Sequence, residues 1–178
     1  MTDLLDFLTS FWMNRLVMIG SFLLGVIGIF FLGYSNGNKK REKYKIIGVT
    51  LIGLFAFAWV IGFSLAWSLK MSARQDVINL LNQPELVIKI NNKELIPEYA
   101  NRVINELKKL ESIPTEHSSP TKEIELEIIS KNKSLTLRIK QDSRNKFEFW
   151  VFLDEYRNTK ENDIGKLSTL VFLKYYGS

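Results

Sequence analysis

Two long apolar runs dominate the first 70 residues of the chain. They extend from Leu16 to Tyr34 and from Ile46 to Leu69, and neither contains a charged residue. Because a helix rises about 1.5 Å per residue, roughly 20 residues are needed to cross a hydrocarbon core of about 30 Å. Both runs reach that length. The sequence therefore predicts a membrane protein whose transmembrane helices, residues 16–34 and 46–69, form an N-terminal hairpin in a lipid bilayer.

The segment 1–15 clusters apolar residues around Asp3 and Asp6. We expect it to lie at the membrane interface and to lead into the first span. The alternative is that the first apolar run belongs to a signal peptide. That run is longer than the usual apolar region of such a peptide, and no small-residue cleavage pattern follows it. A membrane span is therefore the favoured interpretation of the first apolar run.

Beyond the second span the pattern is that of a water-soluble domain over residues 72–178. Helical spacing predicts that the second span continues as a helix until Pro84 ends it. A further helix is predicted over 97–111, where Pro97 suits the first helical position and apolar residues recur every three or four positions. Those apolar positions are Tyr99, Val103, Ile104, Leu107 and Leu110.

Three segments of this domain alternate between apolar and polar residues with a period of two, as half-buried strands do. They are residues 123–128, 134–140 and 147–153. Pairing Leu126 with Leu137 brings apolar side chains together and sets the acidic positions of the first strand opposite basic positions of the second. Continuing the same pattern pairs Ile139 with Phe147. We therefore expect an antiparallel meander with one apolar face.

Shorter signals complete the predicted domain. Leu86–Ile90 is typical of a strand, Asn91-Asn92 of a tight turn, and Lys93–Ile96 of a return strand. The segment 164–176 fits a helix by spacing and a strand by its β-branched and aromatic content, so both remain open. The predicted class is a small α+β domain, its antiparallel sheet packed by one or two helices.

The net charge of +5 is concentrated between the two apolar runs. Residues 35–45 contain five basic residues and one acidic residue, and the basic ones are Lys39, Lys40, Arg41, Lys43 and Lys45. Cytoplasmic loops are rich in Lys and Arg, so we expect this loop inside the cell and both termini outside, in the plasma (inner) membrane. The Lys-, Asn- and Ile-rich composition fits a bacterial protein. A basic excess placed in one loop gives no support for a nucleic-acid partner.

Candidate catalytic chemistry is sparse. The chain contains no cysteine and one histidine, His117, which lies beside Glu116, Ser118 and Ser119. This cluster lacks an orienting acid for nucleophilic catalysis, and zinc would need further ligands drawn from carboxylates. We expect a solvated loop histidine, with a ligand-binding or hydrolase role as the alternative. No metal or cofactor motif is present in the sequence, and we do not expect an enzyme.

Small residues mark one face of each span. Ala58, Gly62 and Ala66 follow one another at every fourth position of the second span, and Ser21 and Gly25 do so on the first. Such faces let helices approach closely. The favoured interpretation is packing within the hairpin, and the alternative is self-association into an oligomer or a pore. Neither span contains an ionisable side chain to carry coupled ion transport.

The expected register places Trp150 and Phe152 on the charged face of the meander. Large aromatic residues on such a face need a cover or a partner. The C-terminal segment would supply the cover. The alternative is a recognition patch formed by Trp150 and Phe152 with Glu127 and Arg138, since aromatic residues and Arg anchor many interfaces.

These observations favour a membrane-anchored, non-enzymatic binding module. Its α+β domain would capture a protein or small ligand at the outer face of the membrane, as an immunity or inhibitor protein does. The alternative is a two-span sensor-effector, whose domain binds a signal and whose helices oligomerise to perturb the membrane.

Overall fold

The computed structural model describes residues 2–13, 15–35, 41–111, 118–131 and 133–176. The chain divides into two compact units, residues 3–69 and the residues from Lys70 onward. The first unit contains α1 (Thr2–Trp12), α2 (Arg15–Ser35) and most of α3, a continuous helix from Glu42 to Leu81. The last turns of α3 belong to the second unit. The predicted extension of the second span as a helix is thus confirmed.

Helices α2 and α3 are long and apolar enough to cross a membrane. Only 17% of the most apolar window of α2 and 11% of that of α3 is buried, whereas a core helix of a soluble protein would be mostly buried. Helix α1 also exposes an apolar stripe at helical spacing. The stripe consists of Leu4, Phe7, Leu8 and Phe11.

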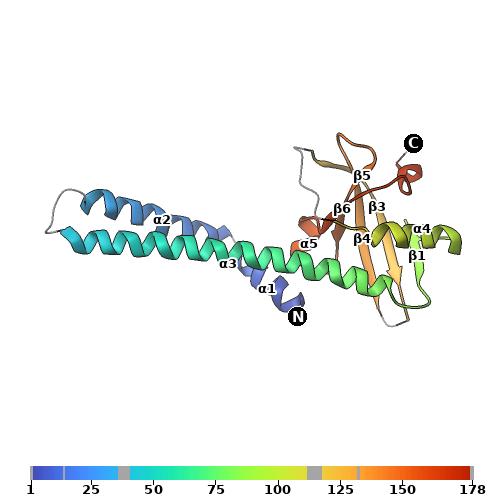
Figure 1. The fold of residues 1–178 in the computed structure, drawn as a ribbon, viewed down its shortest axis with the longest axis horizontal. Coiled ribbons are helices and arrows are strands. Elements are labelled where there is room, and N and C mark those ends of the chain that lie inside the picture. The colour runs from blue at the N-terminus through green and yellow to red at the C-terminus, as the bar shows by residue number, and fades with distance from the viewer. Residues whose placement is uncertain (1, 14, 36–40, 112–117, 132, 177–178) are drawn as a thin grey trace. The chain divides into compact units, whose positions relative to one another are not determined.

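Two glycines bring α2 and α3 together (Figure 1). A Cβ atom on Gly28 would lie 2.9 Å from the carbonyl oxygen of Gly48, and one on Gly48 would lie 2.7 Å from that of Gly28. Gly25 faces the ring of Phe55 one turn earlier, and Ser21 is buried. The hairpin is therefore packed through Gly28 and Gly48, which sequence spacing did not single out.

The small-residue face of α3 has a different neighbour. The position that a Gly62 side chain would occupy is taken by the indole ring of Trp12 from α1. Ala58 and Ala66 are half-buried on either side of it. Packing within one chain thus accounts for the close approach at Gly62.

The second unit is built on a six-stranded antiparallel sheet in the order β2-β1-β3-β4-β5-β6. The predicted antiparallel sheet with helices is confirmed, and it contains three strands beyond the expected meander. The strands are β1 (Val87–Ile90), β2 (Lys93–Glu94), β3 (Pro120–Ile129), β4 (Ser134–Asp142), β5 (Glu148–Leu153) and β6 (Gly165–Ser168). The short helices are α4 (Pro97–Leu107), α5 (Arg157–Glu161) and the 3-10 turn η2 (Leu173–Tyr175).

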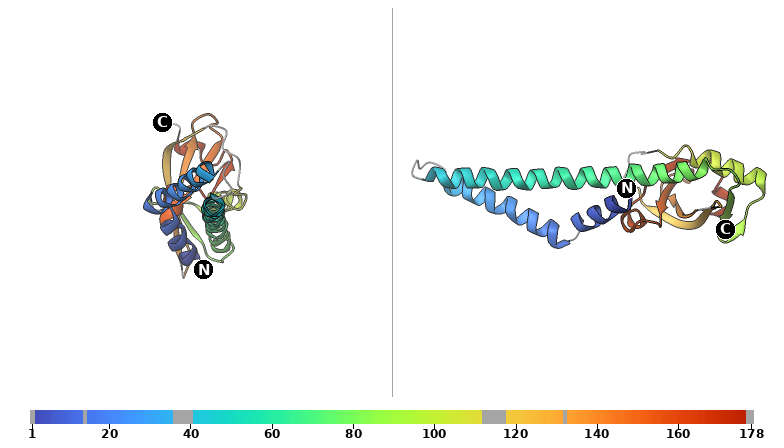
Figure 2. Two further views of the ribbon diagram at one scale, coloured as in Figure 1. Left: turned by 90° about the vertical axis from the view of Figure 1, so that its left-hand side faces the viewer. Right: turned by 90° about the horizontal axis from the view of Figure 1, so that it is seen from below.

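One face of the sheet forms the core with α4, which lies across the strands (Figures 1 and 2). Val77 and Leu80 of α3 and Val103 and Leu107 of α4 join the same buried cluster as the inward residues of β3, β4 and β5. Burying such side chains stabilises a fold by roughly 1.5–3 kcal/mol each. The amphipathic pattern therefore fixes which side of α4 faces the sheet.

Polar contacts hold the last turns of α3 within this unit. The ammonium of Lys70 lies 2.8 Å from the Asp163 carboxylate, and the Arg74 guanidinium donates two hydrogen bonds to the carbonyl of Ile164. The Tyr156 hydroxyl donates to Asp76 at 2.7 Å. These contacts tie Lys70, Arg74 and Asp76 of α3 to the segment 156–164 of the same unit.

Helix α4 is shorter than predicted, because it ends at Leu107 instead of residue 111. After that point the chain turns and Glu111 pairs with Lys166 of β6 through two backbone hydrogen bonds. Pairing of Glu111 with a strand is incompatible with helical geometry, so the helix stops before it.

The predicted register of β3 and β4 is confirmed, with Leu126 opposite Leu137 and Glu125 opposite Arg138. The predicted register of β4 and β5 is wrong, because Ile139 pairs with Val151 and not with Phe147. β4 continues to Asp142, whose side chain then closes a tight turn. The slip is an even number of residues, so every side chain keeps its face.

The predicted hairpin around Asn91 and Asn92 is confirmed, and both residues have positive φ angles, 47° and 64°. The ambiguous segment 164–176 contains a strand first and a helical turn afterwards, β6 and η2. Phe172 and Tyr176 pack against Phe149 on the core face.

Candidate functional site

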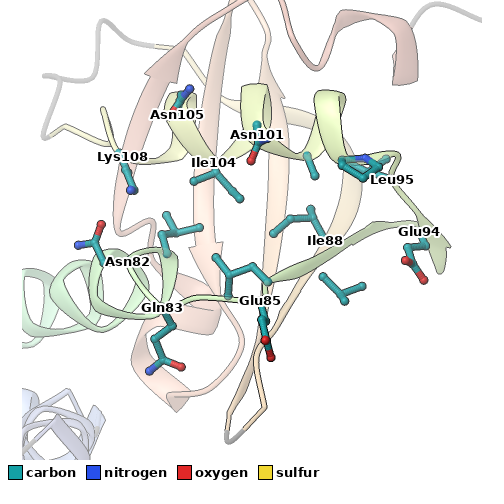
Figure 3. Close-up of a pocket in the computed structure, with 15 residues that line it drawn as sticks. Asn82, Gln83, Glu85, Ile88, Glu94, Leu95, Asn101, Ile104, Asn105 and Lys108 are labelled. Carbon is teal, nitrogen blue, oxygen red and sulfur yellow. The ribbon is translucent and has the colours of Figure 1, made fainter.

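A cleft of about 470 Å³ opens between α4, the start of β1 and the loop that follows α3 (Figure 3). That volume lies within the range of small-ligand sites. Its lining combines apolar side chains, including Ile88 and Ile104, with exposed polar side chains. All of its residues belong to the second unit.

Helix α4 supplies one wall of the cleft. Asn101 and Asn105 are one helical turn apart, so their side chains share a face. Both side chains are exposed and border the cleft, on the side of α4 away from the buried Val103 and Leu107. Among the residues that the structure describes, neither Asn side chain has a hydrogen-bond partner. Each amide offers both donors and an acceptor to a ligand.

Strand β1 supplies the opposite wall. β1 pairs with β3 along all four residues, but β2 pairs only with Lys89 and Ile90. Beyond that pairing, the Leu95 N–H donates to the carbonyl of Ile88 at 2.9 Å. Val87, at the start of β1, therefore has a strand on one side and the cleft on the other.

The loop between α3 and β1 is held in an unusual conformation. Glu85 has a φ of 58°, in the left-handed region that non-glycine residues rarely adopt. The Ser130 hydroxyl donates to the Gln83 side chain at 2.6 Å and ties the loop to the end of β3. Backbone strain of this kind costs on the order of 1–3 kcal/mol and often occurs at ligand sites.

The charged residues of the cleft are two acids and one base. Glu85 and Glu94 are exposed at its β1–β2 side, and Lys108 lies at the end of α4 (Figure 3). None of the three forms an ion pair with another residue of the described ranges. The cleft therefore has a net negative charge and suits a ligand that carries positive charge.

The aromatic residues that the sequence singled out lie on the other face of the sheet, and both are buried. Lys166 places its ammonium 4.1 Å from the centre of the Trp150 ring. Lys140 and Arg138 lie beside the ring of Phe152, at 5.1 and 5.7 Å. The long cationic side chains thus cover both rings.

Arg138 and Glu127 have partners of their own. The Arg138 guanidinium donates to Asp154 at 2.6 Å and also to the carbonyl of Lys160. Glu127 lies 3.9 Å from the ammonium of Lys89 on β1. The structure therefore groups Arg138 with Phe152 and places Glu127 with Lys89 instead.

A buried polar cluster lies next to Trp150. The Asp142 carboxylate accepts hydrogen bonds from the Ser118 hydroxyl, the Trp150 indole and two backbone N–H groups of the following turn. Lys166, only 2% exposed, lies 3.4 Å from the same carboxylate and 3.6 Å from Glu148. Asp142 thus caps the turn that follows β4 and also pairs with Lys166, a contact that the sequence did not indicate.

The basic residues after α2 are described from Arg41 onward. The Arg41 guanidinium lies over the Tyr34 ring at 4.2 Å and donates to the Tyr34 carbonyl at the end of α2. Lys43 and Lys45 are exposed. His117, Lys39 and Lys40 lie outside the described residues.

None of the cleft residues was among the candidates that the sequence indicated. The one available signal was the pair of polar residues Asn101 and Asn105 beside the apolar stripe of the predicted helix. Such pairs are common on solvated helices. Comparison with models of protein families, with curated proteins and with solved structures found no match to this chain.

Proposed function

We propose that this protein is a membrane-anchored, non-enzymatic binding module whose second unit holds a ligand in the cleft between α4 and β1. The observation that carries the proposal is a cleft whose lining combines apolar side chains with polar ones, among them Asn101 and Asn105, which have no partner among the described residues. Binding sites combine these two features, because apolar contact gives affinity and a few polar groups give specificity.

Anchoring is supported by α2 and α3, which have the length and composition of membrane spans. A module of this kind suits capture of a partner that acts at the membrane surface, as inhibitor and immunity proteins require. The alternative sensor-effector role has less support, because Trp12 of the same chain occupies the space at Gly62.

The proposed orientation places the cleft outside the cell and the basic connection inside. Single cysteines at Lys43 and Lys133 test it without interference, because the chain has no native cysteine. We expect a membrane-impermeant maleimide to label Lys133→Cys in intact cells and Lys43→Cys only after the membrane is opened. The reverse labelling would place the cleft in the cytoplasm and contradict the proposed orientation.

Occupancy of the cleft is testable by site-specific photocrosslinking in cells. A benzophenone amino acid at Asn101 is expected to add the mass of a bound ligand to the full chain, measured by intact mass spectrometry. The matched control is Arg102, an exposed neighbour on α4 that lies outside the cleft. Equal adduct formation at both positions, or none at Asn101, would argue against a ligand in the cleft.

A further inference from the structure

We infer that the apolar stripe of α1 is covered by the acyl chains of the bilayer, so that α1 is inserted into the lipid beside α3. The inference rests on the proposed membrane anchoring through α2 and α3. It goes beyond the interfacial location expected from the sequence, because a helix at the interface lies flat on the membrane with its polar face in water.

The polarity of α1 is the reverse of that of a helix on a water-soluble protein, which turns its apolar side chains inward. Among residues 3–12, Thr9 is the one side chain that is fully buried, whereas the large apolar side chains of the stripe are exposed. Trp12, one turn after Thr9, packs against Gly62 of α3. The face that would meet water on a flat interfacial helix is therefore packed against protein.

The contact of Trp12 gives the depth of α1. Gly62, whose side-chain position the indole ring occupies, lies inside the apolar run of α3 that ends at Leu69. Seven residues of helix correspond to about 10 Å, so this end of α1 lies about 10 Å inside the run. From there α1 continues beside α3 in the direction of Leu69 (Figures 1 and 2). The helix therefore runs from the edge of the apolar layer into it.

The distribution of charge along α1 agrees with this direction. Asp3 and Asp6 lie in its first half, toward the edge of the apolar layer, and residues 7–12 contain no charge. Arg15 follows at the start of α2 and is exposed. Arginine side chains near helix ends extend toward the headgroups, so its charge is compatible with this depth.

The apolar stripe also continues the exposed apolar surface of α2. Leu16 and Ile19, in the first turns of α2, are exposed in the same way. The apolar run of α2 has 19 residues and that of α3 has 24, so about five residues of the longer run extend beyond the shorter one. Because α1 lies beside that part of α3, lipid that surrounds the two spans meets the stripe as well.

Collision of spin labels with two reagents tests the inference, using the full chain in phosphatidylcholine–phosphatidylglycerol vesicles. Oxygen partitions into lipid, and a nickel chelate stays in water. Single labels replace Leu4, Phe7 and Phe11, which are 62%, 67% and 62% exposed, so differences in packing between these sites are small. We expect frequent oxygen collisions at Phe7 and Phe11. Nickel collisions should fall from Leu4 through Phe7 and be nearly lost at Phe11.

Two further sites of similar exposure supply the references. Phe57, in the middle of the α3 run, is 64% exposed and represents lipid. Ile96, in the second unit, is 69% exposed and represents water. Because the chain has no native cysteine, each label reports from one site.

The outcomes separate this inference from the proposed anchoring. Frequent nickel collisions at Phe11 together with few at Phe57 would overturn the insertion of α1 and leave the anchoring intact. Equal nickel collisions at Leu4 and Phe11 would show a helix parallel to the surface and would also overturn it. Shielding of Phe11 from both reagents would show that protein covers the stripe, and spin–spin broadening that unlabelled chain removes would identify a second copy. Frequent nickel collisions at Phe57 would contradict the anchoring itself.

Discussion

Replacement of Asp142 by alanine is expected to destabilise the second unit by about 3–5 kcal/mol, because it leaves the Lys166 ammonium buried without its nearest carboxylate. Asp142 is 5% exposed and Lys166 is 2% exposed. The same change removes the acceptor of the Trp150 indole and of the Ser118 hydroxyl. Hydrogen exchange of β4–β6 in the full chain, followed with increasing urea, measures the loss.

Asp154→Ala is the matched control. The Asp154 carboxylate also pairs with a cation of β4, at 2.6 Å from Arg138, but it is 24% exposed. A pair that solvent reaches contributes about 0–1 kcal/mol. A cost for Asp142→Ala no larger than that of the control would show that the buried cluster does not stabilise the fold.

The same cluster should make the stability of the second unit depend on pH. Burial raises the pKa of Asp142. Hydrogen bonds to its carboxylate have the opposite and larger effect, so the pKa lies below its usual value of 3.8. The donors are the Ser118 hydroxyl, the backbone N–H groups of Arg144 and Asn145, and the Trp150 indole. A carboxyl with a lowered folded-state pKa stabilises the fold above its unfolded pKa, and this contribution is lost as the pH falls. The loss of stability in acid should therefore be steeper in the wild type than in Asp142→Ala.

Gly48→Leu is expected to separate α2 from α3. A Cβ atom at Gly48 would lie 2.7 Å from the carbonyl oxygen of Gly28 and 3.0 Å from the backbone nitrogen of Leu32. These are backbone atoms, which cannot move aside as a side chain can. Overpacking at such a contact costs on the order of 1–3 kcal/mol or more, which is large for two helices held by close packing.

Crosslinking in lipid vesicles measures the separation. Cysteines replacing Phe31 and Tyr44, whose rings stack at 5.9 Å between the two helices, should be joined by a short bismaleimide in the wild-type background. Gly48→Leu should abolish most of that product. Gly53→Leu, on the same helix with no atom within 4 Å of its Cβ position, is the control. Equal crosslinking in both variants would contradict the packing at Gly48.

Strand register shows how far local pattern determines structure. The β3–β4 register followed from alternation, because a one-residue slip would turn the apolar side chains of the slipped strand to solvent. The β4–β5 register could not be obtained in this way, because a shift by an even number of residues preserves the faces. The backbone contacts that Asp142 makes in the turn distinguish those registers, and they exist only in the folded chain.

Helix packing likewise depends partly on local pattern and partly on contacts that exist only in the folded chain. Sequence spacing identified small residues on both apolar helices, but it could not distinguish the contact at Gly28 and Gly48 from the face at Gly62. Spacing gives the face of a helix on which a residue lies and says nothing of what approaches that face. The approach of Trp12 to Gly62 depends on how α1 turns back toward α3 within the first unit.

Local sequence pattern was enough to predict the two apolar helices, the basic connection between them, the antiparallel α+β class and the inward faces of α4, β3 and β4, because each depends on the composition or periodicity of neighbouring residues. The covering of Trp150 and Phe152 by cations, the burial of Lys166 beside Asp142 and the cleft could be seen only in the folded chain. The cleft is formed by α3, β1, β2 and α4 together, and its walls are polar positions that no periodicity distinguishes from an ordinary solvated surface. These polar residues form a cleft only because folding of the whole unit brings the elements that carry them close together.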